Sequence, residues 1–120
     1  MIHAKASEKK IPAAFFATEN GTEPVREWLK DLAKADRVRI GEDICDVEFS
    51  WPVGMPLCRP LGNGLYEVRT ALKNRIARVI FAIEEGRMVL LHGFIKKSQS
   101  TPISDIELAR RRLQAYRRRK

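Results

Sequence analysis

Three consecutive apolar runs with a two-residue period occupy the centre of this chain and constrain its fold more than any other feature. They read LYEVRTAL (65–72), RIARVIFAIE (75–84) and RMVLLHGFIKK (87–97). Each run is rich in β-branched and other apolar residues, which is typical of strands. Only KN (73–74) and the last two residues of EEG (84–86) separate the runs, and connections of this length form hairpin turns. The sequence therefore predicts a three-stranded antiparallel meander over residues 65–97.

The residues before the meander predict one strand and two helices. IPAAFFAT (11–18) is short, and Pro12 suits an edge strand, where a missing N–H is tolerated. Thr22 is placed to cap a first helix, Asp36 to cap a second, and Pro52 to end that second helix. The apolar residues that define the two helices are Val25, Trp28, Leu29 and Leu32, then Ile40, Ile44, Val47 and Trp51. We expect both tryptophans to pack in the core or between helix and sheet.

The remaining segments complete an α+β pattern. PVGMPLCRPLGNG (52–64) holds three prolines and three glycines, which indicates a loop with a short strand around Leu57–Arg59. After the meander, Thr101–Pro102 opens a last helix, helped by the Ser104…Glu107 capping pattern. The apolar stripe of that helix contains Ile103, Ile106, Ala109 or Arg110, Leu113 and Tyr116. Two helices, a sheet and a last helix make one α+β domain over residues 1–120.

Charge is spread unevenly along the chain. Residues 1–50 carry eight Lys and Arg against ten Asp and Glu, whereas residues 51–120 carry fifteen against five, for a formal net charge of +8. Seven of the fifteen cations lie in RRRLQAYRRRK (110–120). This asymmetry favours a polyanion or an acidic partner for the second half of the chain. For the terminal segment alone, the alternative is a solvated basic helix end.

The sequence also argues against several classes of protein and site. No stretch approaches the roughly 18 apolar residues that span a membrane, and MIHAKASEKK (1–10) lacks the apolar core of a signal peptide. We therefore expect a cytoplasmic protein. The two cysteines, Cys45 and Cys58, and the two histidines, His3 and His92, do not have zinc-ligand spacings. Unpaired thiols are expected, and no metal or other cofactor is predicted.

Basic residues interrupt the apolar pattern of the meander near one end of the predicted sheet. In the middle strand, Arg78 shares a face with Ile76 and Ile80, while the opposite face is uniformly apolar and should hold the core against the helices. A cation at this position needs a partner or a water-filled hollow. Meander geometry brings Arg69, Arg78 and the strand end at Lys96–Lys97 to the same end of the sheet. The sequence therefore predicts a convergence of cations there.

Two adjacent lysines place one cation on each face of a strand, so one of the pair shares the face of the arginines. Arg59 in the preceding loop is a further candidate. Such a group binds phosphates, and it stabilises the phosphorane formed when an RNA 2′-hydroxyl attacks its own phosphodiester. Cleavage also needs a base and an acid. Glu67 is the nearest carboxylate, whereas His92 is mid-strand and is expected to be a core or sheet residue. The alternative is that the lysines only protect a strand end from aggregation.

Four segments of the second half carry a recognisable pattern. They are GLYEVR, RIARVIF, LLHGFIKKSQSTP and DIELARRRLQAY, and the string hxxFxKKxxxTPxxxIxxA, with h an apolar residue, is their most specific part. Over about residues 55–116 the chain resembles the toxins of the phage Gp49-like / HigB group, within the RelE/ParE superfamily. The resemblance implies a RelE-like fold, with an N-terminal strand and two helices, an antiparallel sheet and a C-terminal helix.

The resemblance also implies a function. Such toxins belong to toxin–antitoxin pairs, and many are metal-independent, ribosome-dependent mRNA endoribonucleases that inhibit translation and are blocked by a HigA-like helix-turn-helix antitoxin. The catalytic cations that it implies are Arg69, Arg78 and Lys97, and Glu67 is added to the catalytic candidates as the nearest carboxylate. The candidate RNA-binding residues are Arg59, Lys73, Lys96 and Arg110, with a second catalytic cation as the alternative role of Lys96.

The chain departs from the RelE pattern in two places. SQSTPIS, after the last strand, has neither the tyrosine nor the histidine that some RelE-type toxins carry there, and Glu67 stands where they place a lysine. Two alternatives therefore stay open, since one fold hosts several functions. One is a non-catalytic ParE-type inhibitor of a protein target such as DNA gyrase. The other is an inactive basic module that binds RNA or DNA.

Overall fold

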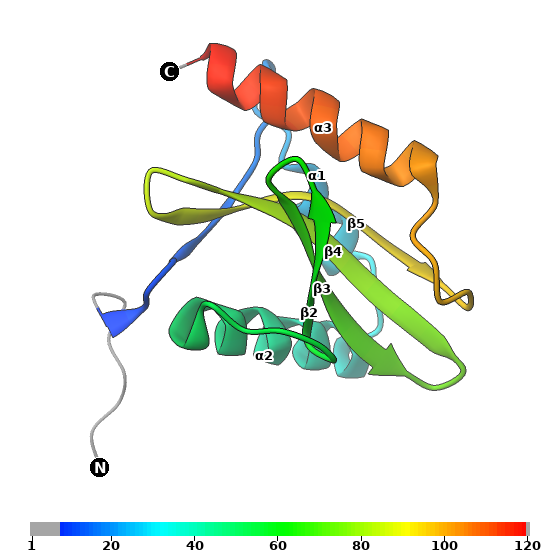
Figure 1. Cartoon of the computed structure of the whole chain (residues 1–120). Coiled ribbons are helices and arrows are strands. Elements are labelled where there is room, and N and C mark those ends of the chain that lie inside the picture. Colours follow the sequence, from blue (N-terminus) through cyan, green and yellow to red (C-terminus); the bar gives the residue numbers. More distant parts are fainter. Residues whose placement is uncertain (1–7, 120) are drawn as a thin grey trace.

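A five-stranded sheet forms the middle layer of the molecule, with the strand order β1-β5-β4-β3-β2 (Figure 1). This computed structural model describes residues 8–119; His3, Lys120 and most of the MIHAKASEKK segment lie outside that range. The strands are β1 (Ala13–Phe15), β2 (Cys58–Gly62), β3 (Leu65–Leu72), β4 (Arg75–Glu84) and β5 (Arg87–Lys96). β1 runs parallel to β5, and the other neighbours are antiparallel. The predicted meander and the edge position of the first strand are therefore confirmed.

Helices cover both faces of this sheet. They are α1 (Pro24–Lys30), α2 (Lys34–Ser50) and α3 (Ile103–Arg118). α1 and α2 lie on one face, and α3 crosses the other (Figure 1). None of the helices within residues 8–119 is long and apolar enough to cross a membrane. The architecture is α+β, as predicted, and is consistent with a RelE-like fold.

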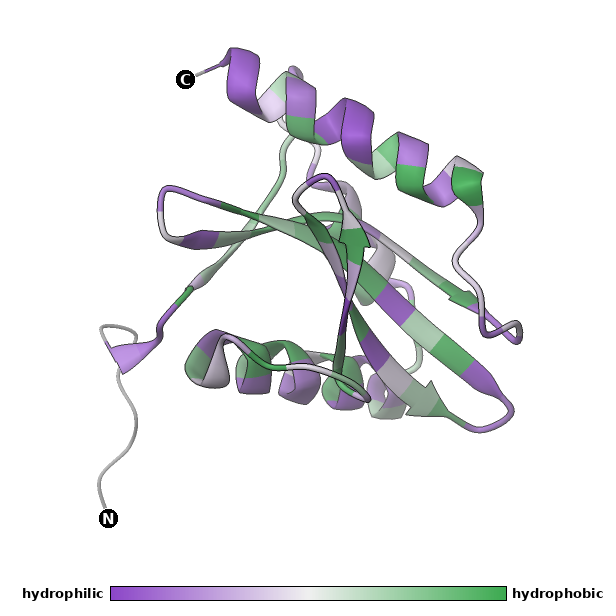
Figure 2. Ribbon diagram, in the orientation of Figure 1, coloured by the Kyte–Doolittle hydropathy of each residue, from purple (hydrophilic) through white to green (hydrophobic). Residues whose placement is uncertain are grey.

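Each face of the sheet has its own apolar core. The core under α1 and α2 contains Ala77, Val79 and Phe81 of β4 with Ile40, Ile44 and Val47 of α2. The core under α3 contains Ile80 and Ala82 of β4 with Phe94, Ala109 and Leu113. The sequence predicted only the core under α1 and α2. That prediction was wrong because α3 buries most of the face that bears Arg78. Hydrophilic stretches interrupt the apolar strands β3 and β4 only locally (Figure 2).

The predicted helix caps are wrong. α1 follows Glu23 rather than Thr22, α2 follows Ala33, and α3 follows Pro102, and none of these residues makes a side-chain capping hydrogen bond. Pro24 fixes the backbone at the first turn of α1 without such a bond. Asp36 lies inside the first turn of α2, where its charge favours the helix dipole. Proline and charge therefore start these helices where we expected hydroxyl and carboxylate caps.

Two other predictions need correction. β2 runs over Cys58–Gly62, beyond the predicted Leu57–Arg59, because a bulge after Pro60 lets the edge strand continue. Ile103 was placed in the apolar stripe of the last helix but is 74% exposed. The packed stripe begins one turn later, at Ile106.

Trp28 fixes α1 to the sheet through Gly93 of β5. A Cβ added at Gly93 would overlap with ring carbons of Trp28. We expect Gly93→Ala to lower the free energy of unfolding by about 1–3 kcal/mol, the usual cost of overpacking. Urea unfolding checks this, with Gly41→Ala as the control, because a Cβ at that α2 position meets nothing within 4 Å. Equal stability of the Gly93 variant and the parent would contradict the described packing.

Candidate functional site

Three arginines from three adjacent strands surround one glutamate on the sheet face next to α3. The ladder pairs Arg59 of β2 with Glu67 of β3, and Arg69 of β3 with Arg78 of β4. Residues paired across strands share a face, and so do Glu67 and Arg69, which are two positions apart. We call these four residues the arginine cluster. The strand register, which follows from two short connections, therefore assembles it.

Glu67 is the centre of the cluster. Its Oε2 lies 2.8 Å from Nη1 of Arg69 and 3.9 Å from Nη1 of Arg59, while its Oε1 lies 3.8 Å from Nε of Arg78. Thr101 donates a hydrogen bond of 2.6 Å to Oε1. The side chains of Glu67 and Arg78 are fully buried, whereas that of Arg59 is 40% exposed. Three positive groups around one carboxylate leave an excess of positive charge, which favours an anionic ligand.

The loop between β5 and α3 lies directly on the arginine cluster. The carbonyl oxygen of Ser98 accepts a hydrogen bond from Nη2 of Arg78. The carbonyl oxygen of Gln99 accepts from Arg59 and Arg69 at 3.4 and 3.3 Å, and its side-chain Oε1 accepts from Arg69 at 3.0 Å. These oxygens occupy positions around the guanidinium groups that phosphate oxygens use in other proteins.

Arg78 is incompletely satisfied in this arrangement. Its Nε and Nη1 are buried and have no hydrogen-bond partner among the described residues. Burial lowers the pKa of its guanidinium from the ordinary value, the nearby charge of Arg69 lowers it further, and Glu67 opposes both effects. A buried donor without a partner costs free energy. The cluster therefore contains donors that an additional acceptor would satisfy.

A family model described as "Phage derived protein Gp49-like" matches residues 27–114, which run from within α1 to within α3 and include the whole arginine cluster. The chain belongs to this Gp49-like family. The family is toxin-like and occurs in toxin–antitoxin contexts. No curated protein matches the chain.

The Gp49-like chain has a second polar group beside the cluster. Nε2 of His92 lies 2.7 Å from Oδ1 of Asp105, and Nζ of Lys96 lies 3.3 Å from Oδ2. Phe94 separates this group from Arg78, with its ring stacked on His92 at 5.2 Å and 5.9 Å from the guanidinium carbon of Arg78. The sequence prediction that His92 is a sheet residue is confirmed, but its partner on the first turn of α3 was missed.

The pKa of His92 predicts a specific pH dependence. Burial lowers it below the ordinary value of 6.5, Arg112 and Lys96 act in the same direction, and Asp105 opposes them. The unfolded chain therefore binds more protons here, so this contribution to stability is full above pH 6.5 and is lost as pH falls through the lower folded pKa.

We expect the free energy of unfolding to decrease between pH 7.5 and 5.5, and His92→Gln to reduce that decrease. Glutamine keeps an N–H that can donate to Asp105 but does not titrate. Urea unfolding at several pH values measures the effect, and an NMR titration of the imidazole gives the pKa directly. A measured imidazole pKa above the ordinary value of 6.5 would contradict the lowered pKa of His92.

The structure brings together only some of the predicted site residues. Lys96 shares the face of the arginines but pairs with Asp105. Lys97 follows the last residue of β5 and is exposed, with no hydrogen bond or ion pair to the cluster within residues 8–119. Lys73 is exposed in the β3–β4 turn, and Arg110 lies on α3, without such a contact in the described part of the chain. The neighbours of the cluster that sequence reasoning missed are Phe94, Ser98, Gln99 and Thr101.

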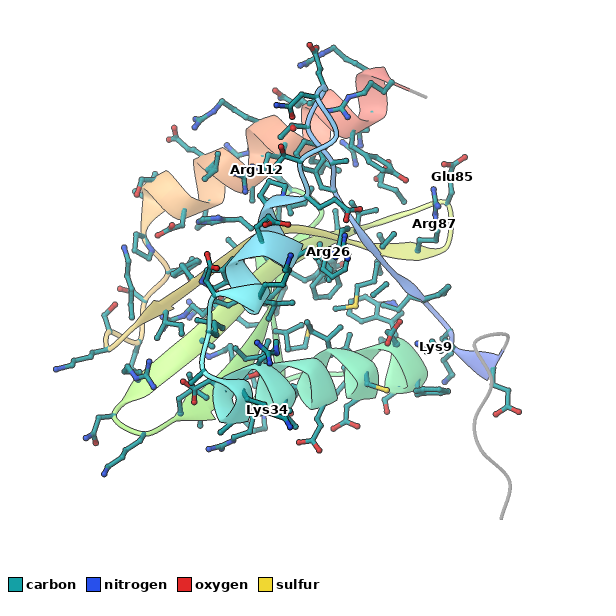
Figure 3. The ribbon with its side chains drawn as sticks, turned by 180° about the vertical axis from the view of Figure 1, so that it is seen from behind. Lys9, Arg26, Lys34, Glu85, Arg87 and Arg112 are labelled. Atoms are coloured by element: carbon teal, nitrogen blue, oxygen red, sulfur yellow. The ribbon has the colours of Figure 1, made fainter. Side chains whose placement is uncertain are left out.

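Other arginines lie outside the cluster. Arg112 reaches from α3 to the sheet and donates a 2.8 Å hydrogen bond to the carbonyl oxygen of Leu91. Arg26 lies on α1, and Arg87 lies beside the β4–β5 turn (Figure 3).

Within residues 8–119, no group of three or more His, Cys, Asp or Glu side chains is arranged to hold a metal ion.

Proposed function

We propose that this Gp49-like protein is the toxin of a type II toxin–antitoxin pair related to HigB and RelE. In this proposal it is a ribosome-dependent endoribonuclease that cleaves messenger RNA without a metal ion and so inhibits translation. The observation that carries the proposal is the arginine cluster, with the buried and incompletely hydrogen-bonded Arg78 at its inner end. The family match supports the toxin-like class.

The cluster suits phosphodiester cleavage by an internal 2′-hydroxyl. Negative charge increases on the phosphorus-bound oxygens in the transition state, and fixed donors that face this charge lower the barrier. Arg69 and Arg78 are opposite each other on neighbouring strands, so their guanidinium groups can contact one phosphate together. Phosphate binding at this position replaces the carbonyl oxygens of Ser98 and Gln99, which requires the β5–α3 loop to move.

The remaining roles combine position in the site with the resemblance. Glu67, the nearest carboxylate, accepts the proton of the 2′-hydroxyl, for which Thr101 must release its carboxylate. The bond from phosphorus to the 5′-oxygen breaks as the 2′-oxygen bonds to phosphorus, and the leaving 5′-oxygen takes a proton from water. Lys97 supplies a further cation from the exposed loop. The residues proposed to bind the phosphates of the RNA strand outside the cleaved bond are Arg59, Lys73, Lys96 and Arg110. A HigA-like antitoxin with a helix-turn-helix domain is the proposed inhibitor, and it would neutralise the same basic surface.

Induced expression in a bacterial host tests the function. We expect growth arrest together with new 5′ ends inside translated codons, which primer extension on abundant messages detects. Arg26→Ala is a suitable control variant, because Arg26 is an exposed α1 residue that forms a surface ion pair with Glu23. It should arrest growth as the parent does.

Two other outcomes would each overturn the nuclease proposal. Growth arrest with intact messages and accumulating DNA breaks would indicate a protein target, with gyrase as the first to examine. Absence of arrest, with the protein folded and abundant, would indicate a basic binding module. Steep salt dependence of RNA binding without cleavage would support that last interpretation.

A further inference from the structure

A cavity of about 390 Å³ opens beside the arginine cluster, at an edge of the sheet. Arg69 belongs to both the cavity and the cluster, and Gln99, whose side chain accepts from Arg69, also lines the cavity. The lining also includes the segment before β2, with Met55, and Asp43 of α2. This volume is in the lower part of the range for small-molecule sites, about 300–1,000 Å³. The cavity therefore has room for one small planar group next to a phosphate-binding position.

The cavity exists because β2 is shorter than β3. Cys58, the first residue of β2, pairs with Val68, and the N–H of Arg69 donates to the carbonyl oxygen of Leu57 at 2.8 Å. Backbone groups two residues apart on a strand point the same way. The N–H and C=O of Ala71 therefore face the cavity, and no strand of the described residues pairs with them there.

The lining combines apolar surfaces with fixed polar groups. Ala71, Ile76 and Met55 provide apolar contacts, and Met55 is 58% exposed at the wall. A methionine thioether packs favourably against aromatic rings. Asp43 is held in place by Thr70, whose hydroxyl donates to Oδ2 at 2.7 Å. A carboxylate has about four acceptor sites, so Asp43 can accept further bonds without losing Thr70.

We propose that this cavity binds a nucleobase of the RNA, and that it prefers guanine. The proposal rests on the proposed function, because a strand whose phosphate lies at Arg69 brings a base to the cavity. Proteins that read single-stranded RNA stack unpaired bases on side chains and bond their Watson–Crick edges. Guanine is the RNA base with two adjacent donors on that edge, N1–H and the N2 amino group, and these match the two oxygens of Asp43.

The other bases fit the carboxylate less well. Adenine and cytosine each present one amino group next to a ring nitrogen whose lone pair faces the carboxylate. Uracil presents a single N–H between two carbonyl oxygens. Preference for guanine thus follows from the two acceptor oxygens of Asp43 rather than from the size of the base.

Binding to oligonucleotides that cannot be cleaved tests the inference without relying on activity. The probes are 2′-O-methyl hexanucleotides, UUGUUU and UUAUUU, which lack the attacking hydroxyl proton, measured by fluorescence anisotropy. We expect the parent to bind the guanine probe about tenfold more tightly, the discrimination of one bidentate contact. Asp43→Asn should bring the two affinities within about twofold of each other by replacing one acceptor with a donor.

Matched variants keep the test interpretable. Asp46→Asn makes the same charge change at an exposed position on the same helix and should keep the full preference. Ala71→Phe fills the cavity from the exposed side of β3 and should also remove the preference, whether or not Asp43→Asn folds well. Equal binding of both probes by the parent, or an undiminished preference in a folded Asp43→Asn or Ala71→Phe protein, would overturn the inference.

Failure of this inference is distinguishable from failure of the proposed function. A parent protein that cuts messages in cells but binds both probes equally has the nuclease activity without the guanine site. A parent that neither cuts messages nor binds either probe refutes both statements.

Discussion

Arg78→Ala is expected to reduce RNA cleavage by about 10²–10³-fold, the usual cost of removing one fixed donor from a transition state. Growth arrest should be lost with it. The reason is position: Arg78 is the innermost member of the arginine cluster, fully buried, with two of its nitrogens free of hydrogen bonds within the described residues. Its donors are therefore held in place before any substrate arrives.

The measurement is the rate of message cleavage by purified protein on programmed ribosomes, with circular dichroism to verify folding. Arg78→Lys is the informative companion, because lysine keeps the charge but lacks the planar fork that contacts two phosphate oxygens. It should recover little of the activity. Arg26→Ala removes the same charge from the exposed surface of α1 and should cleave at the parent rate. A folded Arg78→Ala protein with parent activity would exclude the cluster as the catalytic site.

Glu67→Gln is expected to lower the free energy of unfolding by about 3–5 kcal/mol, the cost of breaking a buried ion pair by removing one partner. Glutamine has the shape of glutamate and can still accept from Thr101, so the change is mainly one of charge. Arg69 and Arg78, which are opposite each other on neighbouring strands, then lack the negative charge that lies close to both of them. Like charges directly opposite on a sheet are destabilising.

Urea unfolding measures this loss, and a double-mutant cycle shows its origin. In the Arg78→Met background, Glu67→Gln should cost clearly less than it does alone, because one of the buried positive charges is absent. Glu107→Gln, at an exposed position on α3, should change stability by less than about 0.5 kcal/mol. Equal costs of Glu67→Gln in both backgrounds would show that the carboxylate does not compensate Arg78.

The local parts of the fold were predictable from the sequence. Alternation and short turns define the meander, and the register of β3 with β4 follows once their turn is placed. That register is enough to predict that Arg69 and Arg78 meet, as they do. The convergence of the arginines is therefore a consequence of chain geometry within a segment of 33 residues, 65–97.

Features that depend on contacts distant in sequence were not predictable. Which lysine joins the face of Arg78 depends on the register shift between Ile80 and Phe81 in the β4–β5 pair, which places Lys96 on that face. Lys97 follows the end of β5. The contacts of Ser98 and Gln99 with the cluster depend on how α3 docks, since that helix fixes the far end of the loop. Burial of Glu67 likewise requires α3 and its loop, and alternation alone indicated only which face it occupies.

The parallel pairing of β1 with β5 has a consequence for the order in which the molecule assembles. Ala13 pairs with Met88, so two partners separated by most of the chain must meet. On the ribosome, the first strand emerges long before its neighbour is synthesised, whereas the hairpins of the meander close as soon as each turn is made. We therefore expect β1 to add to the sheet last. Docking of this short edge strand completes the sheet after the strands that carry the arginines are already paired.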